Sequence, residues 1–337
     1  MIKATVIDKD YGSVSAEKLT WLQGEYAFRG IELRLLHLAK ESEIIEQCQH
    51  DEVILATGNP PLTAHVLNNL PALRMVQRFG IGVNSIDLDA AAANGIVISN
   101  MPGFCITELA VHATAMILNI IRNIGFYDRG IRSGDWRKAK GPVPRNPQNL
   151  VLGLYGFGGS AREIYKIFNK GFGSRVIVND PYFNNDGTWD VAQVDFEEML
   201  QQADIISIHA PLTPETHHIF NARAFRKMKT GAMIINIARG ELINQDDLIA
   251  AIETEEIFGA GLDVFAEEPL PSGSRLTALE TTVLTPHSAF YGEDAINTQL
   301  SLALSLVDTF INSARLDRRY IANKAVIEKL SHITIEN

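Results

Sequence analysis

Short runs of β-branched and other apolar residues alternate with helical patterns along nearly the whole chain of 337 residues. This alternation is typical of α/β folds in which helices join parallel strands. A first series of predicted strands comprises Ala4–Ile7, Glu32–Leu36, Val53–Ala56, Met75–Gln77 and Val97–Ser99. Helical segments such as Ser15–Trp21 and Asp87–Ala93 lie between them. A chain of this length exceeds one core of ordinary size, so we expect two domains.

A second and cleaner series of strands begins near Leu150. It comprises Val151–Tyr155, Arg175–Val178, Ile205–Ile208, Met233–Asn236, Gly261–Val264 and Thr282–Thr285. Six strands with intervening helices match one complete doubly wound dinucleotide-binding domain. A long apolar helix is predicted over Thr107–Ile124, before this series.

The tail, Asp294–Asn337, has a helical pattern and is too short to form a domain. We expect it to pack back on the N-terminal half, which makes that half discontinuous. The predicted fold is therefore α/β with two Rossmann-like, doubly wound domains. One is a discontinuous, flavodoxin-like substrate (catalytic) domain over residues 1–99 and 292–337, and the other is a dinucleotide-binding domain inserted over residues 100–291.

A glycine-rich motif follows the first strand of the second series. The chain reads Gly156-Phe-Gly158-Gly159-Ser160-Ala161, and a helical pattern comes next. This is the G-x-G-x-x-A form of the dinucleotide fingerprint, in the strand–turn–helix context that gives it meaning. Gly156 permits a tight turn, and Gly158 lets the backbone approach a pyrophosphate at the helix N-terminus. The small Ala161 allows close packing of helix on strand.

An acidic residue stands where this fingerprint requires one. The next strand ends at Asn179-Asp180, about twenty residues further on, where a carboxylate accepts hydrogen bonds from the adenine ribose. It also repels a 2′-phosphate, and Pro181 rather than an arginine follows it. The two signals together predict NAD in preference to NADP. An ordinary turn residue before proline is the alternative interpretation of Asp180.

Three charged or titratable residues, Arg239, Glu268 and His287, come just after strands of the second series. Ligands of open parallel sheets bind outside the carboxyl ends of the strands, so all three can face one crevice. Histidine is suited to give a proton to a ketone that receives a hydride, and a neighbouring carboxylate favours its charged form. An arginine can clamp a substrate carboxylate and polarise the adjacent carbonyl. Taken singly, each could instead be a turn residue, a strand-end cap or a solvated acid.

The motifs around these residues occur in a characteristic order. They read Asn236-Ile-Ala-Arg239-Gly240, Gly261-Leu-Asp263-Val-Phe265-Ala-Glu-Glu268-Pro269 and Thr285-Pro286-His287-Ser288-Ala289. With them, the chain from Gln77 to Asp294 resembles the D-isomer-specific 2-hydroxyacid dehydrogenase family. The resemblance implies that Arg239 binds the substrate and that Glu268, rather than Glu267, pairs with the catalytic His287. It also implies reduction of a 2-oxoacid to a D-2-hydroxyacid by NADH, and the reverse.

The resemblance implies further site residues. In the first domain, the loop Gly80, Ile81, Gly82 and Val83 would hold the substrate carboxylate through backbone N–H groups, together with Arg239. Cofactor contacts are implied at Gly156, Gly158, Gly159, Ser160, Asp180, His209, Ala210, Pro211, Thr213, Thr216, Ile237, Ala238 and Asp263, with Thr107 as a further candidate. Asp263 would lie beside the nicotinamide. The long helix that contains Thr107 is commonly part of a dimer interface in relatives, so a homodimer is expected.

Two departures from the usual family pattern stand out. Gly159-Ser160 replaces the commoner Arg-Ile of the glycine loop, which removes a side chain that often lies near the pyrophosphate. Asn84-Ser85 replaces the more usual Asp-Asn. Neither change removes a catalytic group, but the affinity for the cofactor could be altered.

Alternative functions remain open on the same scaffold. One is a glyoxylate or hydroxypyruvate reductase. Another is a phosphoglycerate dehydrogenase, which would have basic residues after the third strand, where Ala56–Thr63 has none. Formate dehydrogenases are disfavoured because they place glutamine where Glu268 stands. From a different class, Met101–Cys105 and Pro286–Glu293 look like the C-terminal-binding-protein branch, which suggests an NAD(H)-sensing, corepressor-like binding protein. The lack of a disordered or basic interaction tail favours the enzyme.

Charge and cysteine content argue against other classes of partner. The formal net charge is -10, and the densest basic stretch, Arg129–Arg145, fits a solvated helix end and loop. No apolar run is long enough to cross a bilayer, and the N-terminus lacks a signal-peptide pattern. Cys48 and Cys105 cannot build a disulfide framework and have no metal-ligand spacing. We expect a cytoplasmic protein that binds a small molecule and no metal, membrane or nucleic acid.

The substrate side chain is the least constrained feature. Tyr11, Asn59, Phe104, Phe290 and Tyr291 are candidates to line its pocket, and each is equally consistent with packing. Because the segment after the third strand has no basic residue, the working hypothesis is an apolar or aromatic 2-oxoacid.

Overall fold

The computed structural model describes residues 1–8, 14–136 and 142–336. The chain divides into two compact units, which we call unit 1 (Met1–Phe104 with Tyr291–Asn337) and unit 2 (Cys105–Phe290). The predicted first boundary, after residue 99, lies slightly too early. Asn100 N–H donates to Tyr320 O and Met101 N–H donates to Gly80 O, and these bonds keep the segment after the fifth strand on unit 1.

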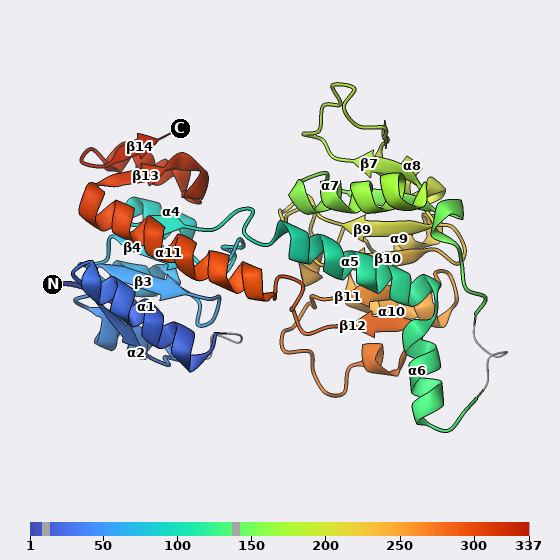
Figure 1. Cartoon of the computed structure of the whole chain (residues 1–337), viewed down its shortest axis with the longest axis horizontal. Helices are drawn as coiled ribbons and strands as arrows, with labels where there is room; N and C mark the ends of the chain where they lie inside the picture. Colours follow the sequence, from blue (N-terminus) through green and yellow to red (C-terminus); the bar gives the residue numbers. More distant parts are fainter. Residues whose placement is uncertain (9–13, 137–141, 337) are drawn as a thin grey trace. The chain divides into compact units, whose positions relative to one another are not determined.

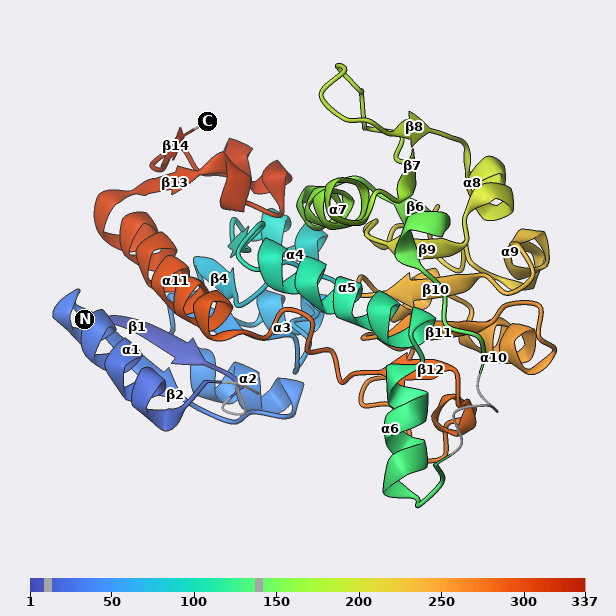
Figure 2. The same ribbon diagram turned by 45° about the vertical axis from the view of Figure 1, so that its right-hand side comes forward.

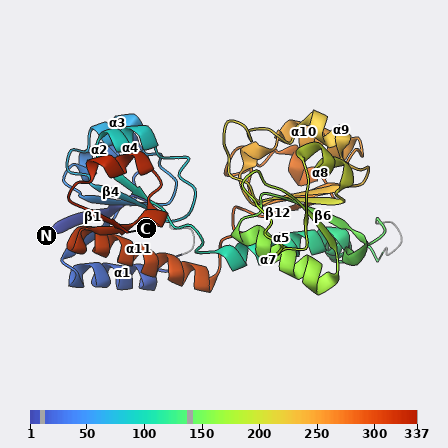
Figure 3. The same ribbon diagram turned by 90° about the horizontal axis from the view of Figure 1, so that it is seen from above.

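Unit 1 is built on a five-stranded parallel sheet with the flavodoxin-like order β2-β1-β3-β4-β5. Its elements before unit 2 are β1 (Ile2–Val6), α1 (Ala16–Phe28), β2 (Ile31–Leu35), α2 (Glu41–Cys48), β3 (Val53–Ala56), α3 (Ala64–Asn68), β4 (Met75–Arg78), α4 (Leu88–Ala93) and β5 (Val97–Ser99). Helices α1 and α11 (Glu293–Ser313) cover one face of the sheet, and α2, α3 and α4 cover the other (Figure 3). Burial of both faces explains why β3 is apolar throughout.

Helix α11 completes the core of unit 1, although it follows unit 2 in the sequence (Figure 1). Leu300, Leu304 and Phe310 lie on one side of this helix and are buried in the same cluster as residues of α1 and β1. The buried Tyr26 of α1 also donates its hydroxyl to Ala303 O of α11, at 3.2 Å. The tail therefore returns to the N-terminal half of the chain.

The end of the tail is not helical, so that part of the prediction for Asp294–Asn337 is wrong. Helix α11 ends at Ser313, and Ala314 takes a left-handed backbone with φ 50°. Two short parallel strands, β13 (Arg315–Asp317) and β14 (Thr334–Glu336), follow, with 3-10 turns between them. The buried Asn323 side chain accepts from Ile98 N–H and donates to Ile96 O. Such long-range bonds fix the path of the chain without leaving a periodic sequence signal.

Unit 2 contains a seven-stranded parallel sheet with the order β12-β11-β10-β9-β6-β7-β8. Its elements are α5 (Ile106–Ile121), α6 (Ile124–Arg132), β6 (Val151–Tyr155), α7 (Gly159–Tyr165), β7 (Arg175–Asn179), β8 (Ala192–Gln193), α8 (Phe196–Gln202), β9 (Ile205–Ile208), α9 (Ala222–Lys227), β10 (Met233–Asn236), α10 (Gln245–Glu253), β11 (Gly259–Leu262) and β12 (Thr282–Leu284). This is the doubly wound order, with its switch point between β6 and β9. The predicted fold class is therefore confirmed, but the count of six strands is wrong. The extra strand, β8, has two exposed residues and no apolar signal.

Helices cover both faces of the unit 2 sheet (Figure 3). One buried cluster joins α5 and α7 to the sheet, and the other joins α8, α9 and α10 to it. Polar side chains mark where several of these helices begin. Asp195, Asn221 and Asn244 each accept a hydrogen bond from a backbone N–H in the first turn of α8, α9 and α10.

The helix predicted over Thr107–Ile124 corresponds to α5, which ends three residues earlier, at Ile121; a second helix, α6, follows after a bend (Figure 2). Asn123 has a left-handed backbone with φ 56°, a conformation that asparagine tolerates better than most residues. Its side chain donates to Pro142 O at 2.5 Å, and Asn119 Oδ1 accepts from Gly125 N–H at 2.8 Å. Among the described residues, no single helix is long and apolar enough to span a membrane; α5 and α6 meet that test only as a pair bent by 65°.

Candidate active site

The strands of unit 2 end side by side, which brings the loops that follow them to one edge of the sheet. Tyr155, the last residue of β6, is in register with Asn179 of β7 and Ile208 of β9. Asn236 of β10 is in register with Ile208 and with Leu262 of β11. The predicted catalytic residues and most of the predicted cofactor contacts lie in these loops, at the edge where open parallel sheets bind ligands.

Gly156 makes the turn after β6 possible. Its φ is 90°, and a Cβ at this position would lie 2.8 Å from Ala210 N and 2.9 Å from His209 C. Any side chain would therefore push the loop after β6 away from the loop after β9. Gly158 is the N-cap of α7, and a Cβ there would meet nothing within 4 Å. The backbone thus borders open space at the start of α7, which fits a dinucleotide pyrophosphate.

Ile106 occupies the space beside the unusual Gly159-Ser160 pair. A Cβ at Gly159 would lie 2.6 Å from Ile106 Cδ1, at the N-terminus of α5. A larger residue, such as the arginine usual in the family, would require Ile106 to move. Ala161 is fully buried against the sheet. Thr107, a further candidate for a cofactor contact, is exposed in the first turn of α5.

The Asp180 carboxylate ties the end of β7 to the glycine loop. Its Oδ2 accepts from Phe157 N–H at 2.7 Å, and its Oδ1 accepts from Tyr182 N–H at 2.8 Å. The carboxylate is therefore held beside the first turn of the fingerprint, and its further bond to the ribose remains a prediction.

His209 lies beside the glycine loop, and both of its ring nitrogens are within hydrogen-bond distance of serine hydroxyl groups. Its Nδ1 is 3.2 Å from Ser160 Oγ, and its Nε2 is 2.8 Å from Ser207 Oγ. Burial lowers the pKa of His209 to about 3, so the ring is neutral near pH 7. The departure from the family pattern at Ser160 thus supplies a hydrogen-bond partner to His209.

The turn after His209 and the segment after β10 both lie at the edge formed by the carboxyl ends of the unit 2 strands. Thr216 Oγ1 donates to Pro211 O at 2.8 Å and accepts from Thr213 N–H at 2.8 Å, so this hydroxyl holds the turn together. Ala238 N–H donates to Asn236 Oδ1 at 3.0 Å, and the neighbouring Ile237 is buried. Direct contact of any of these residues with the cofactor remains a prediction.

His287 and Glu268 form a hydrogen-bonded pair. His287 Nδ1 lies 2.7 Å from Glu268 Oε2, and Phe265 N–H donates to Glu268 Oε1 at 3.0 Å. Desolvation by burial acts to raise the pKa of the Glu268 carboxyl. The hydrogen bonds from His287 and Phe265, with the charges of His287 and Arg239, outweigh it and hold this pKa below its usual value. The carboxylate is therefore ionised beside the imidazole at neutral pH.

Arg239 begins a 3-10 turn, Gly240–Leu242, directly after β10. Its Nη1 donates to Ala238 O at 2.5 Å, and Asn236 Nδ2 donates to Arg239 O at 2.7 Å. Burial lowers the pKa of the guanidinium, and the charges of Glu241 and Glu268 oppose that shift. The group remains a cation at neutral pH. Asn236, which orders this segment, belongs to the predicted motif, but its role was not predicted.

Gly240 joins the Arg239 loop to the Glu268 loop. A Cβ at Gly240 would overlap the carbonyl group of Phe265 and lie 2.6 Å from Ala266 N. The two backbones are in direct contact, and no other amino acid fits between them. Because the first loop carries Arg239 and the second carries Glu268, this contact sets the distance between the cation and the imidazole–carboxylate pair.

Asp263 is buried, and its carboxylate is committed to the loop that carries His287. Oδ1 accepts from Ser288 N–H and Oδ2 from Ala289 N–H, both at 2.8 Å. Oδ1 also accepts from Thr285 Oγ1 at 2.5 Å. The sequence pointed to Asp263 only as a cofactor contact, which remains a prediction. The signal that could have revealed this second role is a carboxylate inside the predicted strand Gly261–Val264, whose other residues are apolar and expected to be buried.

The predicted carboxylate-binding loop, Gly80–Val83, lies in unit 1 after β4. Arg78 sits beneath it, with Nε donating to Gly82 O at 3.0 Å and Nη1 donating to Phe79 O. Gly80 N–H donates to Arg78 O at 3.0 Å. In the described part of the chain, the N–H groups of Ile81, Gly82 and Val83 have no acceptor. Three of the four predicted donors are therefore available to an anion, and Gly80 already has a partner.

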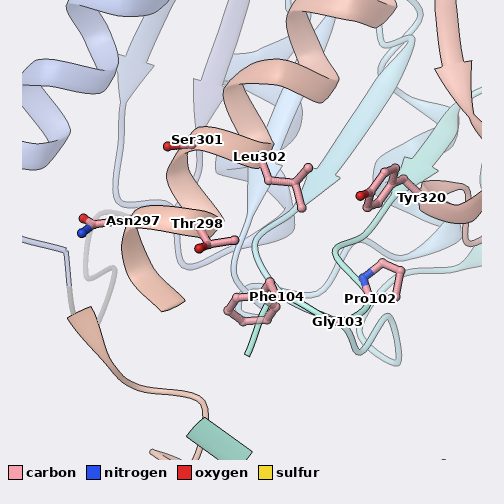
Figure 4. Close-up of a pocket in the computed structure, with 8 residues that line it drawn as sticks. All are labelled: Pro102, Gly103, Phe104, Asn297, Thr298, Ser301, Leu302 and Tyr320. Atoms are coloured by element: carbon pink, nitrogen blue, oxygen red, sulfur yellow. The ribbon is translucent and has the colours of Figure 1, made fainter. Parts of the chain in front are cut away.

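The residues predicted to line the substrate side-chain pocket are divided between the two units: Asn59, Phe104 and Tyr291 belong to unit 1, and Phe290 belongs to unit 2. Phe104 borders a hollow of unit 1 together with Pro102, Gly103, Asn297, Thr298, Ser301, Leu302 and Tyr320 (Figure 4). None of these eight residues is charged. In unit 2, the ring of Phe290 packs edge to face against His287, with centroids 6.4 Å apart. Asn59 and Tyr291 are exposed, and Tyr11 lies outside the described residues.

The fold and the site together define a class of protein. Among doubly wound folds, a glycine fingerprint beside the switch point is typical of dinucleotide binders. An imidazole–carboxylate pair and a partly buried cation at the same edge suit the transfer of a proton together with a hydride. The chain therefore has the fold and the site features of a dinucleotide-dependent dehydrogenase.

Comparison with known proteins identifies the family. Residues 114–289 match the model of the D-isomer specific 2-hydroxyacid dehydrogenase, NAD binding domain. The chain belongs to the D-isomer-specific 2-hydroxyacid dehydrogenase family, and it is an NAD-dependent oxidoreductase.

Relatives of several kinds support this assignment. The chain is 33% identical over 251 residues to a glyoxylate reductase of Korarchaeum cryptofilum, covering 73% of this chain and 75% of the relative. It is 32% identical over 274 residues to a D-3-phosphoglycerate dehydrogenase of Synechocystis sp., covering 80% of this chain and 49% of that longer protein. The crystal structure of a D-lactate dehydrogenase from Lactobacillus jensenii with NAD+ gives a TM-score of 0.77 at 25% identity, covering 95% and 99% of the two chains. The relatives share a reaction class and differ in their named substrates.

We predict that Gly240→Ala separates the Arg239 and Glu268 loops. Displacing a catalytic group by about 1 Å can cost on the order of 100-fold in rate, so kcat/KM should fall by that factor. Forcing a methyl group into a packed contact should also lower the free energy of unfolding by about 1–3 kcal/mol. Steady-state kinetics and urea unfolding measure the two effects.

The matched control is Gly273→Ala, because a Cβ at Gly273 meets nothing within 4 Å. This variant should behave like the wild type. Wild-type kinetics in Gly240→Ala would show that the two loops do not depend on this backbone contact.

Proposed function

We propose that the chain reduces a 2-oxoacid to a D-2-hydroxyacid with NADH, and catalyses the reverse reaction with NAD. The observation that carries the proposal is the 2.7 Å pair of His287 Nδ1 with Glu268 Oε2, at the sheet edge that also holds Arg239 and the glycine fingerprint. When bound, the nicotinamide supplies or accepts the hydride, which is chemistry that no amino-acid side chain offers.

His287 is proposed as the acid–base residue. Its Nδ1 is committed to Glu268, so Nε2 is the nitrogen that gives a proton to the substrate carbonyl oxygen, or takes one from the hydroxyl in the reverse reaction. The ionised Glu268 stabilises the imidazolium and fixes the plane of the ring. Arg239 is proposed to hold the substrate carboxylate and to polarise the adjacent carbonyl.

The substrate is proposed to be an apolar or aromatic 2-oxoacid. The Phe290 ring against His287 supports this, since it places an apolar surface beside the reacting group. Arg78 is a basic residue next to Gly58, in the segment after β3. Its guanidinium donates to the backbone carbonyl of Gly82, in the predicted carboxylate-binding loop, so it already has a structural role there. Glyoxylate or hydroxypyruvate remains the alternative, because some relatives are named glyoxylate reductases. A 3-phosphoglycerate-type substrate is a further alternative, suggested by the relative from Synechocystis sp..

A homodimer is proposed to form through α6 and the flank of α5. Helix α6 has no buried residue, and Ile124, Ile131 and Val111 are each more than half exposed. Apolar side chains exposed on both helices suggest an interaction surface, and symmetric pairing with a second copy would cover them on both chains.

The other expectations concern surroundings and partners. A cytoplasmic location, the absence of nucleic-acid and membrane partners and the likeness to the C-terminal-binding-protein branch all stay predictions. Cys48 and Cys105 are buried free thiols in the structure. Of the basic stretch considered for nucleic acid, Arg137, Lys138 and Lys140 lie outside the described residues.

Replacing His287 tests the proposed chemistry. Asparagine suits the left-handed backbone of this residue, whose φ is 50°, so His287→Asn should keep the loop intact while removing the proton donor. We expect kcat for 2-oxoacid reduction to fall about 10²–10⁴-fold. The dissociation constant of NADH, measured by fluorescence titration, should stay close to that of the wild type.

The assay is a panel of pyruvate, phenylpyruvate, 4-methyl-2-oxopentanoate, glyoxylate, hydroxypyruvate and 3-phosphohydroxypyruvate, each with NADH and with NADPH. The proposal expects the highest kcat/KM with NADH and an apolar 2-oxoacid. A best substrate of glyoxylate or a phosphorylated acid would replace the substrate assignment. Tight NADH binding without turnover of any 2-oxoacid would favour the sensing role.

The Glu268 carboxylate predicts a particular pH dependence. The pKa of the Glu268 carboxyl is lowered, so the carboxylate is charged at and above the ordinary glutamate pKa. The negative charge that stabilises the His287 imidazolium is lost only when the pH falls below this lowered pKa. In Glu268→Gln that charge is missing at every pH. The alkaline limb of the reduction rate should therefore move to lower pH.

The pH profile of kcat for wild type and Glu268→Gln measures this shift. Glu267→Gln is the control, because the neighbouring Glu267 is not part of the hydrogen-bonded pair. An alkaline limb that is unchanged in Glu268→Gln would contradict the role given to the carboxylate.

The dimer surface is tested by Ile131→Asp, which places a charge on the exposed side of α6. We expect the sedimentation velocity of the wild type to correspond to a dimer and that of the variant to shift towards the monomer, since a buried unpaired charge is costly. Phe28→Asp serves as the control on a different exposed apolar residue. A monomeric wild type at micromolar concentration would overturn the proposal.

A further inference from the structure

Helix α5 touches the catalytic loop through one histidine that the sequence analysis did not single out. His112 lies midway along α5, and its Nε2 is 3.0 Å from Thr285 Oγ1. Thr285 is the first residue after β12, two positions before His287. The mechanism proposed above gives no task to His112.

The direction of this hydrogen bond follows from the partners of Thr285. A hydroxyl has one proton to donate, and an ionised carboxylate can only accept. Thr285 Oγ1 donates to Asp263 Oδ1 at 2.5 Å, so its oxygen must accept from His112. His112 therefore presents an N–H at Nε2, which also lies 3.6 Å from Asp263 Oδ1. The chain of bonds runs from His112 through Thr285 to Asp263.

Asp263 connects the His112–Thr285 hydrogen bond to the loop that carries His287. The residue is 1% exposed, and its carboxylate accepts from the N–H groups of Ser288 and Ala289, while its backbone carbonyl accepts from His287 N–H at 2.8 Å. A buried carboxylate needs several donors, and the His112–Thr285 pair completes the set. The loop is wrapped around this one side chain.

The His287 backbone depends on such support. Its φ of 50° is in the left-handed region, which is unfavourable for a residue other than glycine and persists only where the surroundings enforce it. The bonds to Asp263 hold the residues on either side of the catalytic ring, and Glu268 holds the ring itself. A shift of Thr285 or Asp263 would therefore turn the Nε2 of His287 away from its working direction.

We propose that His112 is a positioning residue for the proton transfer at His287, acting through Thr285 and Asp263. This inference rests on the proposed function of His287 as the acid–base group. Helix α5 therefore has a second role besides covering the sheet, because it fixes the position of the loop after β12.

The test compares two substitutions at His112. The amide nitrogen of His112→Gln reaches about as far as Nε2 of histidine and keeps a donor to Thr285, whereas His112→Leu removes the donor. We expect His112→Leu to lower kcat about tenfold, the loss that follows from leaving one buried polar contact unmade. The dissociation constant of NADH should change by less than about twofold, within the usual error of independent sites. His112→Gln should recover most of kcat.

Thr285 supplies an independent pair, which also serves if His112→Leu does not fold. Thr285→Val removes the hydroxyl at nearly constant shape, and Thr285→Ser keeps it. If the two residues act in one chain of bonds, His112→Leu with Thr285→Val should lose no more than the worse single variant. Multiplicative losses, or equal losses in His112→Leu and His112→Gln, would overturn the proposal.

A readout that does not require turnover separates this inference from the proposed function. The proton–carbon signal of the His287 ring, assigned by its absence in His287→Asn, should move in His112→Leu and return in His112→Gln. A signal that stays at the wild-type position in the folded His112→Leu variant would contradict the positioning role. If the wild type reduced no 2-oxoacid, the proposed function would fail, and the ring signal would still decide whether His112 positions His287.

Discussion

The shared register of the parallel strands is the constraint on which the rest of unit 2 depends. Strands β6, β7, β9, β10 and β11 end at the same level, so the loops after them must begin side by side. The groups discussed for the cofactor or the reaction in unit 2 lie at the ends of these strands, in the loops or first helical turn after them, in the loop after β12 or on α5. A slip of one residue between two strands would turn the side chains of one loop to the opposite face. The site is therefore fixed first by backbone pairing and only then by side chains.

Close contacts between loops convert this common edge into one site. Gly240 brings the Arg239 loop against the backbone of Phe265, and Phe265 N–H in turn binds Glu268. Glu268 holds the ring of His287, whose backbone is anchored on Asp263. The cation, the carboxylate and the imidazole are thus linked through a short series of contacts. Loss of any one link is expected to disturb the groups on both sides of it.

The sequence was sufficient for the features that follow local rules and insufficient for those set by distant contacts. Apolar strand runs and the glycine fingerprint led to the α/β class, which the structure confirms. The two-residue strand β8 and the bend at Asn123 left no periodic signal. His287 and Glu268 could be paired only by analogy, because 18 intervening residues separate them in the chain. The role of His112 could not be predicted, since it depends on one contact with the hydroxyl of Thr285, which is distant in the sequence.

The most direct test of the account is a crystal structure of the protein with NADH and oxamate, an unreactive analogue of a 2-oxoacid. We expect His287 Nε2 to lie within about 2.6–3.2 Å of the amide carbonyl oxygen of oxamate, which stands where the keto oxygen of a substrate would be. We also expect the Arg239 guanidinium to contact the oxamate carboxylate while Glu268 remains bonded to His287 Nδ1. An oxamate that is bound beside the nicotinamide but contacts neither His287 nor Arg239 would contradict the central claim.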